Sequence, residues 1–200
     1  MESTAISADK WHLGCSSSPA PWRRQVYSFP VSGFGVDFFN ADDRAAALNE
    51  ESYMNIRRTV RRHVNTLFES FVRDHISRRS SCAFETTLRS GITFDQTARA
   101  REAGFVIELR YVALRNFSMH VERVKMRADA GGHSAPESVL RTIYTASIRN
   151  LAQAIREMDF VHVYDNSTWG LTPSVLLQAE SGEVVYLAED IPDWLAIALG

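Results

Sequence analysis

Carboxylates that follow an apolar run offer the first chemistry in this chain. In residues 38–43, FFNADD, two phenylalanines are followed by Asn40 and Ala41 and then by Asp42 and Asp43. A carboxylate at the end of a strand can accept the proton of a substrate hydroxyl as a general base. An equally supported alternative is that Asp42 or Asp43 caps a helix predicted to start at Arg44.

A second candidate site lies in residues 83–88, AFETTL, where Glu85 precedes the hydroxyls of Thr86 and Thr87. Such side chains at a strand end can hydrogen-bond the hydroxyl groups of a polar substrate. The alternative is a structural glutamate paired with Arg89, an interaction that contributes little when it is exposed.

Two arginines form a third candidate site. Arg123 and Arg127 are four residues apart, so they share one face of a predicted helix, and two guanidinium groups on one face suit a phosphate. Gly131, Gly132 and His133 follow, and the glycines predict a mobile flap. The alternative is a solvated helix face, the common setting of arginine.

The overall composition narrows the classes of function. The 200 residues are 45% hydrophobic and 23% charged, which is typical of soluble globular proteins, and the formal net charge is −2. That balance supplies no general attraction for nucleic acid or an anionic membrane. No apolar run reaches the roughly 20 residues of a membrane span. We therefore expect a cytoplasmic protein without a membrane or nucleic-acid partner.

Other polar groups have simpler interpretations. The arginines within residues 57–62 lie opposite an apolar stripe, which predicts a solvent-facing helix surface, with an RNA contact as the alternative. The histidines lack the spacing of metal ligands, and Cys15 and Cys82 fit neither a disulfide framework nor a four-ligand zinc site. We predict no metal held by protein side chains alone.

The surrounding elements must position these residues. After Gly35, apolar runs alternate with helical periods, which predicts an α/β domain over residues 35–200 with a mostly parallel sheet flanked by helices. Residues 1–34 show no such period, so we predict an irregular segment there. The predicted elements are strands at 36–40, 82–86, 105–114 and 160–165, helical stripes at 53–71 and 140–158, a hairpin of 174–180 and 183–188, and a helix at 190–199.

Five short motifs, taken in order, resemble the zeta-toxin family of P-loop kinases. They are FNAD at 39–42, FETTL at 84–88, ERV at 122–124, GGH at 131–133 and DNS at 165–167, and the resemblance covers residues 35–200. Some members of that family phosphorylate the sugar 3-hydroxyl of UDP-N-acetylglucosamine with ATP. The resemblance implies a three-layer P-loop kinase fold, ATP and Mg²⁺ as cofactors, a small-molecule substrate and an antitoxin protein as partner.

The resemblance also implies a role for individual residues. The general base on the acceptor hydroxyl would be Asp42. Residues expected to bind substrate are Asn40, Glu85 and Thr86. Those expected to bind phosphate are Arg123, Arg127 and His133, the last at a lid position where characterised toxins carry an arginine. The residue expected beside the nucleotide base is Asn166.

The family's phosphate-binding loop, Gly-x-x-x-x-Gly-Lys-Ser/Thr, has no match in this chain. The only lysines are Lys10 and Lys125, and neither follows a glycine. Because phosphoryl transfer depends mainly on positioning and charge stabilisation, we expect negligible kinase activity even with Asp42 in place. The expected function is a degenerate zeta-toxin-like, ATP-dependent kinase of a small hydroxyl-bearing substrate, such as a UDP-amino sugar. The alternative is a non-catalytic pseudokinase that retains substrate binding.

The genetic code offers an origin for the missing loop. Residues 22–29, WRRQVYSF, can be encoded so that a shift of one base reads Gly-Ala-Gly-Lys-Ser-Thr-Leu. Only the first glycine of that reading is forced, by the tryptophan codon. We hypothesise that the N-terminal segment is an out-of-frame reading of a former phosphate-binding loop, with the frame restored before Gly35.

Overall fold

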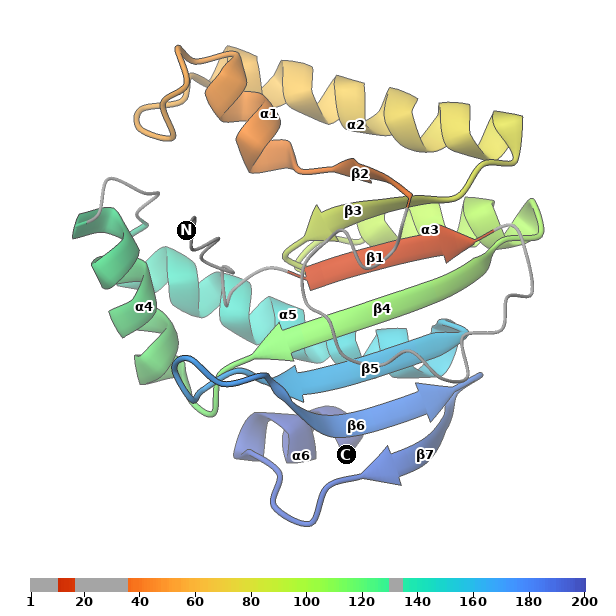
Figure 1. Cartoon of the computed structure of the whole chain (residues 1–200), viewed down its shortest axis with the longest axis vertical. Coiled ribbons are helices and arrows are strands. Elements are labelled where there is room, and N and C mark those ends of the chain that lie inside the picture. Colours follow the sequence, from red (N-terminus) through yellow and green to blue (C-terminus); the bar gives the residue numbers. More distant parts are fainter. Residues whose placement is uncertain (1–10, 17–35, 130–134) are drawn as a thin grey trace.

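The computed structural model describes residues 11–16, 36–129 and 135–200, which form an α/β fold (Figure 1). The predicted fold class, a sheet combined with helices, is confirmed at this level. The strands are β1 (Trp11–Ser16), β2 (Asp37–Phe39), β3 (Cys82–Thr86), β4 (Val106–Ala113), β5 (Phe160–Asp165), β6 (Ser174–Glu180) and β7 (Glu183–Leu187). The helices are α1 (Ala41–Ala47), α2 (Arg58–Arg78), α3 (Ile92–Glu102), α4 (Phe117–Asp129), α5 (Glu137–Glu157) and α6 (Asp193–Leu199).

The sheet is mixed, so the prediction of a mostly parallel sheet is wrong. Its seven strands follow the order β2-β3-β1-β4-β5-β6-β7. Only the β2–β3 and β4–β5 pairs are parallel, and the other neighbouring pairs are antiparallel. The reason at the centre is β1, which lies between β3 and β4 and runs against both of them. These six residues form a strand within the segment predicted to be irregular.

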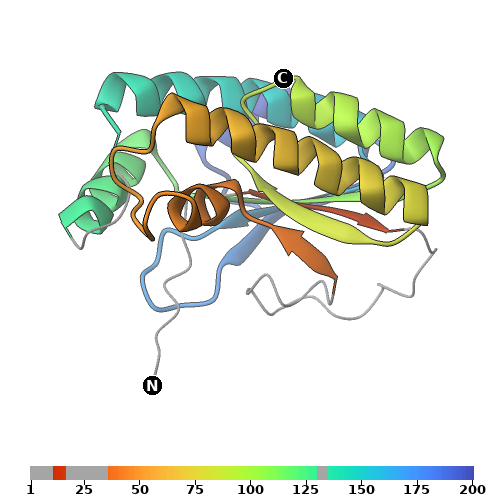
Figure 2. The same ribbon diagram turned by 90° about the horizontal axis from the view of Figure 1, so that it is seen from above.

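One face of the sheet packs against helices. Figure 2 shows α2, α3, α5 and α6 on the same side, and no helix of the described residues covers the opposite side. Within the described part of the chain, the expected third layer is therefore missing. Burial alternates along β4, where Ile107, Leu109 and Tyr111 are at most 1% exposed. Tyr111 contacts the helical layer directly, because its hydroxyl lies 3.1 Å from the Ser147 hydroxyl of α5.

The strands β3, β4 and β5 all end at one side of the sheet, named here the carboxyl-end side, and α1 and α4 flank that side (Figure 1). In contrast, β1 ends at the opposite side, where β4 begins, because Ser16 pairs with Val106, the first residue of β4. Side chains that follow β2 and β3 can therefore meet, as the sequence predicted for parallel neighbours.

Candidate functional site

A cavity of about 320 Å³ opens where β2 and β3 end, and it is named here the β2–β3 cavity. The segment after β2, the first turns of α2 and the end of β3 supply its walls. Its lining residues are Asn40, Ala41, Asp42, Ala45, Arg61, Val64, Asn65, Glu85, Thr86, Thr87 and Arg89. The structure thus brings together the predicted general base, Asp42, and all three predicted substrate-binding residues, Asn40, Glu85 and Thr86.

Asn40 positions Asp42 at the start of α1. The Asn40 backbone is extended, and its Oδ1 accepts hydrogen bonds from the N–H groups of Asp42 (2.9 Å) and Asp43 (3.1 Å). Asn40 is therefore the N-cap, and the alternative in which Asp42 or Asp43 caps the helix is wrong. This cap places both aspartates in the first helical turn.

The two neighbouring aspartates have different surroundings. Asp43 accepts a hydrogen bond of 2.9 Å from the Tyr53 hydroxyl, and this bond raises the pKa of Tyr53 above its ordinary value. Asp42 lines the cavity, and its Oδ1 lies 3.9 Å from Nη1 of Arg61. The Asp42 side chain is 37% exposed, so a ligand that enters the cavity can reach its carboxylate.

Arg61 was predicted to face solvent, and its side chain is exposed as predicted, but it also lines the β2–β3 cavity. The helices α1 and α2 pack against each other, so an arginine in the first turns of α2 reaches the first turn of α1. An ion pair as exposed as Arg61–Asp42 adds little stability. Its consequence is a guanidinium group in the cavity wall, beside the candidate base.

The turn after β3 is held by hydrogen bonds from three directions. The Thr86 hydroxyl contacts the Thr93 hydroxyl (3.0 Å) and accepts a hydrogen bond from the N–H of Leu88 (3.0 Å). Leu88 is fully buried with a left-handed φ of 52°, and its carbonyl accepts a hydrogen bond of 2.7 Å from Asn150 of α5. This turn fixes where the chain leaves the sheet before Arg89.

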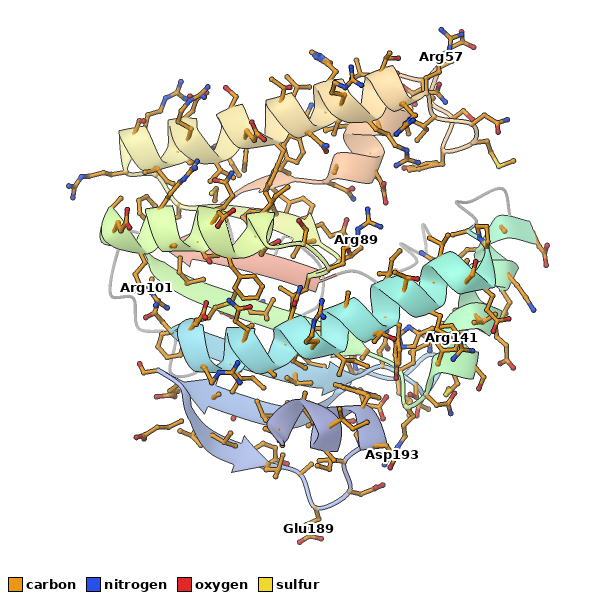
Figure 3. The ribbon with its side chains drawn as sticks, turned by 180° about the vertical axis from the view of Figure 1, so that it is seen from behind. Arg57, Arg89, Arg101, Arg141, Glu189 and Asp193 are labelled. Carbon is orange, nitrogen blue, oxygen red and sulfur yellow. The ribbon has the colours of Figure 1, made fainter. Side chains whose placement is uncertain are left out.

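Arg89 lies between two hollows of the surface. It lines the β2–β3 cavity and also a second cavity of about 320 Å³ beside the N-terminal turns of α5. Figure 3 shows the Arg89 side chain pointing into the space between α2 and α5. Sequence reasoning missed Arg61, Asn65 and Arg89 as lining residues, and the only signal for Arg89 was its position directly after the FETTL motif.

Two of the predicted phosphate-binding residues, Arg123 and Arg127, are not among the residues that line the β2–β3 cavity. Arg123 of α4 donates hydrogen bonds to the backbone carbonyls of Asn166 (2.6 Å) and Ser167 (3.3 Å). Its guanidinium carbon lies 5.5 Å from the centre of the Trp169 ring. Arg123 therefore supports the loop after β5. Arg127 is partly buried on the next turn of α4, and the predicted flap with His133 lies outside the described residues.

Asn166 and its neighbours form an ordered turn at the end of β5. The N–H of Asn166 donates to the carbonyl of Ala113 (2.8 Å), and Asp165 accepts hydrogen bonds from the N–H and hydroxyl of Ser167. The Ser167 hydroxyl in turn accepts from the N–H of Arg115 (2.7 Å). Asn166 thus joins β4 and β5 through its backbone, and it lies beside Arg123, away from the lining of the β2–β3 cavity.

The described residues form no candidate metal centre of their own. Across residues 11–16, 36–129 and 135–200, no group of three or more His, Cys, Asp or Glu side chains could hold a metal ion. The β2–β3 cavity instead presents carboxylates, threonine hydroxyls and the guanidinium groups of Arg61 and Arg89 to a polar ligand.

Comparisons with known proteins give little guidance on function. No family model matches the chain, and no solved structure matches it. An uncharacterized protein of Haemophilus influenzae is 27% identical over 78 residues, which are 39% of this chain and 53% of that protein. The chain therefore spans about half the length of this curated relative. None of the described helices combines the length and apolar character required to cross a bilayer.

Proposed function

We propose that the chain is a degenerate zeta-toxin-like kinase that retains the acceptor half of the site, meaning the residues that bind the hydroxyl-bearing substrate. The observation that supports this is the β2–β3 cavity, which gathers Asn40, Asp42, Glu85 and Thr86 from two distant segments. Carboxylates and guanidinium groups in one polar cavity can bind the hydroxyl and amide groups of a sugar. A UDP-amino sugar is the ligand class that the sequence resemblance adds to this geometry.

In this proposal the cavity binds a hydroxyl and orients it without phosphorylating it. Asp42 accepts a hydrogen bond from the ligand hydroxyl, and Glu85 binds a second polar group from the wall formed by β3. Arg61 lies 3.9 Å from Asp42, and its positive charge favours the ionised carboxylate that accepts such a bond. The donor half of a kinase site, which would hold the nucleotide phosphates, is lost in this proposal, because the sequence has no Gly-x-x-x-x-Gly-Lys-Ser/Thr loop.

Isothermal titration calorimetry tests the proposal with UDP-N-acetylglucosamine, and with UDP and ATP–Mg²⁺ as comparison ligands. We expect binding of the sugar nucleotide, weakened at least about tenfold by Asp42→Asn or Glu85→Gln because each removes a charged hydrogen-bond acceptor. Asp43→Asn is the matched control, since Asp43 is the neighbouring carboxylate outside the cavity lining. Equal affinity in Asp42→Asn, Asp43→Asn and the unmodified chain would contradict the proposal.

A second candidate is an active kinase with ATP and Mg²⁺ as cofactors, and the position of Asp42 favours it. Asp42 lines the cavity with a partly exposed carboxylate, as a general base on an acceptor hydroxyl requires. An antitoxin partner belongs to this candidate, because a chain without activity leaves no toxicity to neutralise. Its test is ATP-dependent phosphorylation of UDP-N-acetylglucosamine, followed by ³¹P NMR, with loss of the signal in Asp42→Asn.

A further inference from the structure

The strand β7 forms one edge of the sheet that the described residues build. It is the last strand in the sheet order and, among the described residues, it pairs only with β6. All five of its residues are exposed, and four of them are apolar: Val184 (44%), Val185 (56%), Tyr186 (46%) and Leu187 (44%). Sheet edges are ordinarily shielded by lysine, proline or a very short strand. The opposite edge, β2, has only three residues, whereas β7 carries no such shield.

The two ends of β7 are held in place, so the strand is preformed. At the hairpin, Ser181 and Gly182 both have positive φ values (50° and 87°), and the N–H of Ser181 donates to the carbonyl of Asp159 (2.8 Å). Just after the strand, the N–H of Ala188 donates to the carbonyl of Leu176 (2.9 Å). A partner strand would therefore bind an edge that needs little ordering, which lowers the entropic cost of association.

The surroundings of this edge are acidic. Glu180 and Glu183 lie at its first end, and Glu189 follows its second end, next to Asp190, whose carboxylate pairs with Arg115. No lysine or arginine occurs after Arg156 in the whole sequence. An extended partner with basic residues at both ends would thus meet opposite charge at each end of the strand, which gives the interaction direction and salt dependence.

A second copy of the chain does not complement this edge. Pairing of β7 with β7 would bring acidic ends together, and like charges suppress such an encounter.

We propose that β7 is a docking edge for an extended segment of another protein, with apolar or β-branched residues at its centre and lysine or arginine at both ends. The segment would add to the sheet beyond β7 through backbone hydrogen bonds, while its basic ends contact the acidic residues around the strand. This surface is separate from the β2–β3 cavity, so the proposal stands or falls independently of the proposed function.

Titration of the full chain with the peptide acetyl-KRVTVTVKR-amide, followed by backbone NMR, tests the proposal. We expect amide shifts centred on residues 183–187 and an affinity that falls as NaCl rises from 50 to 300 mM. Val185→Lys, which introduces the charge that protects natural edges, should weaken binding at least about tenfold. Ile92→Lys is the matched control, because Ile92 is also exposed (52%) but lies at the start of α3.

Two results would overturn the docking proposal. One is equal binding of acetyl-EEVTVTVEE-amide, since that peptide keeps the strand propensity and reverses the charge. The other is a dimer of the free chain in light scattering that Val185→Lys dissociates, because the edge would then bind a second copy. A circular dichroism spectrum of each variant that matches the unmodified chain shows that the variant is folded.

Discussion

Replacing Asn40 distinguishes a residue that positions the candidate base from one that contacts the ligand. In the structure its Oδ1 accepts two backbone N–H groups at the start of α1, at 2.9 and 3.1 Å. Removal of an N-cap side chain by alanine costs about 0.5–2 kcal/mol. In a domain of this size a loss of about 1 kcal/mol lowers the melting temperature by about 2–4 °C. We therefore expect Asn40→Ala to melt about 2–4 °C lower.

The matched variant is Asn40→Asp, because a carboxylate caps a helix about as well as an amide. Urea denaturation should place Asn40→Asp within about 0.5 kcal/mol of the unmodified chain, and Asn40→Ala clearly below both. Titration with UDP-N-acetylglucosamine then separates the roles. If the cap acts only by placing Asp42, affinity falls in Asn40→Ala and recovers in Asn40→Asp. Equal stability of Asn40→Ala and the unmodified chain would refute the assignment of Asn40 as the cap.

Three further changes probe individual contacts of the fold. His75 is buried, which by itself lowers its pKa, but hydrogen bonds to the Phe71 carbonyl and the Asp37 carboxylate outweigh burial and raise the pKa above 6.5. The stabilisation from the protonated imidazole is complete below pH 6.5 and is lost as the pH rises through the folded-state pKa. The free energy of unfolding in urea should therefore decline toward pH 8, and Asp37→Asn should reduce that decline. In the same assay, Gly182→Ala should lower the free energy of unfolding by about 1 kcal/mol or more, because Gly182 has a φ of 87° and an added Cβ would lie 3.2 Å from the backbone carbonyl oxygen of Arg156. Its control, Ser181→Asn, should leave the free energy of unfolding unchanged. Asn150→Ala leaves a buried carbonyl unpaired and should cost about 1–3 kcal/mol and weaken ligand binding, whereas Asn150→Asp tests whether the amide N–H is the required group.

Apolar runs followed by polar residues located most of the sheet. The strands β3, β5 and β6 have the predicted bounds, because each is short, rich in apolar residues and bordered by turn or polar residues. The hairpin around Ser181-Gly182 is confirmed, since two successive residues with positive φ match a two-residue turn. In contrast, β1 has the sequence WHLGCS, with a glycine and no clear alternation. Its pairing on both sides with β3 and β4 is a tertiary feature that local patterns do not encode.

The same limit separates the site residues that were predicted from those that were missed. Asp42 and Glu85 were predicted correctly as neighbours because adjacent parallel strands end on the same side of a sheet. That rule needs only the positions of the strand ends in the sequence. Arg61 was missed because helical periodicity describes only the apolar face of its own helix and says nothing of α1 packed beside its first turns. Arg123 was assigned to phosphate from its spacing, yet its guanidinium group binds the carbonyls of the loop after β5.

The direction of β1 bears on the proposal that the chain retains only the acceptor half of the site. This six-residue strand is about 20 Å long at roughly 3.3 Å per residue, and it ends at the side of the sheet where β3 and β4 begin. The out-of-frame hypothesis accounts for this, because a shifted reading would change the strand and the loop together and leave the residues after Gly35 intact. Sequencing of the gene is decisive: a shifted frame across residues 22–29 that encodes no glycine-lysine-serine/threonine run would rule the hypothesis out and leave the reversal of β1 as an original property of this fold.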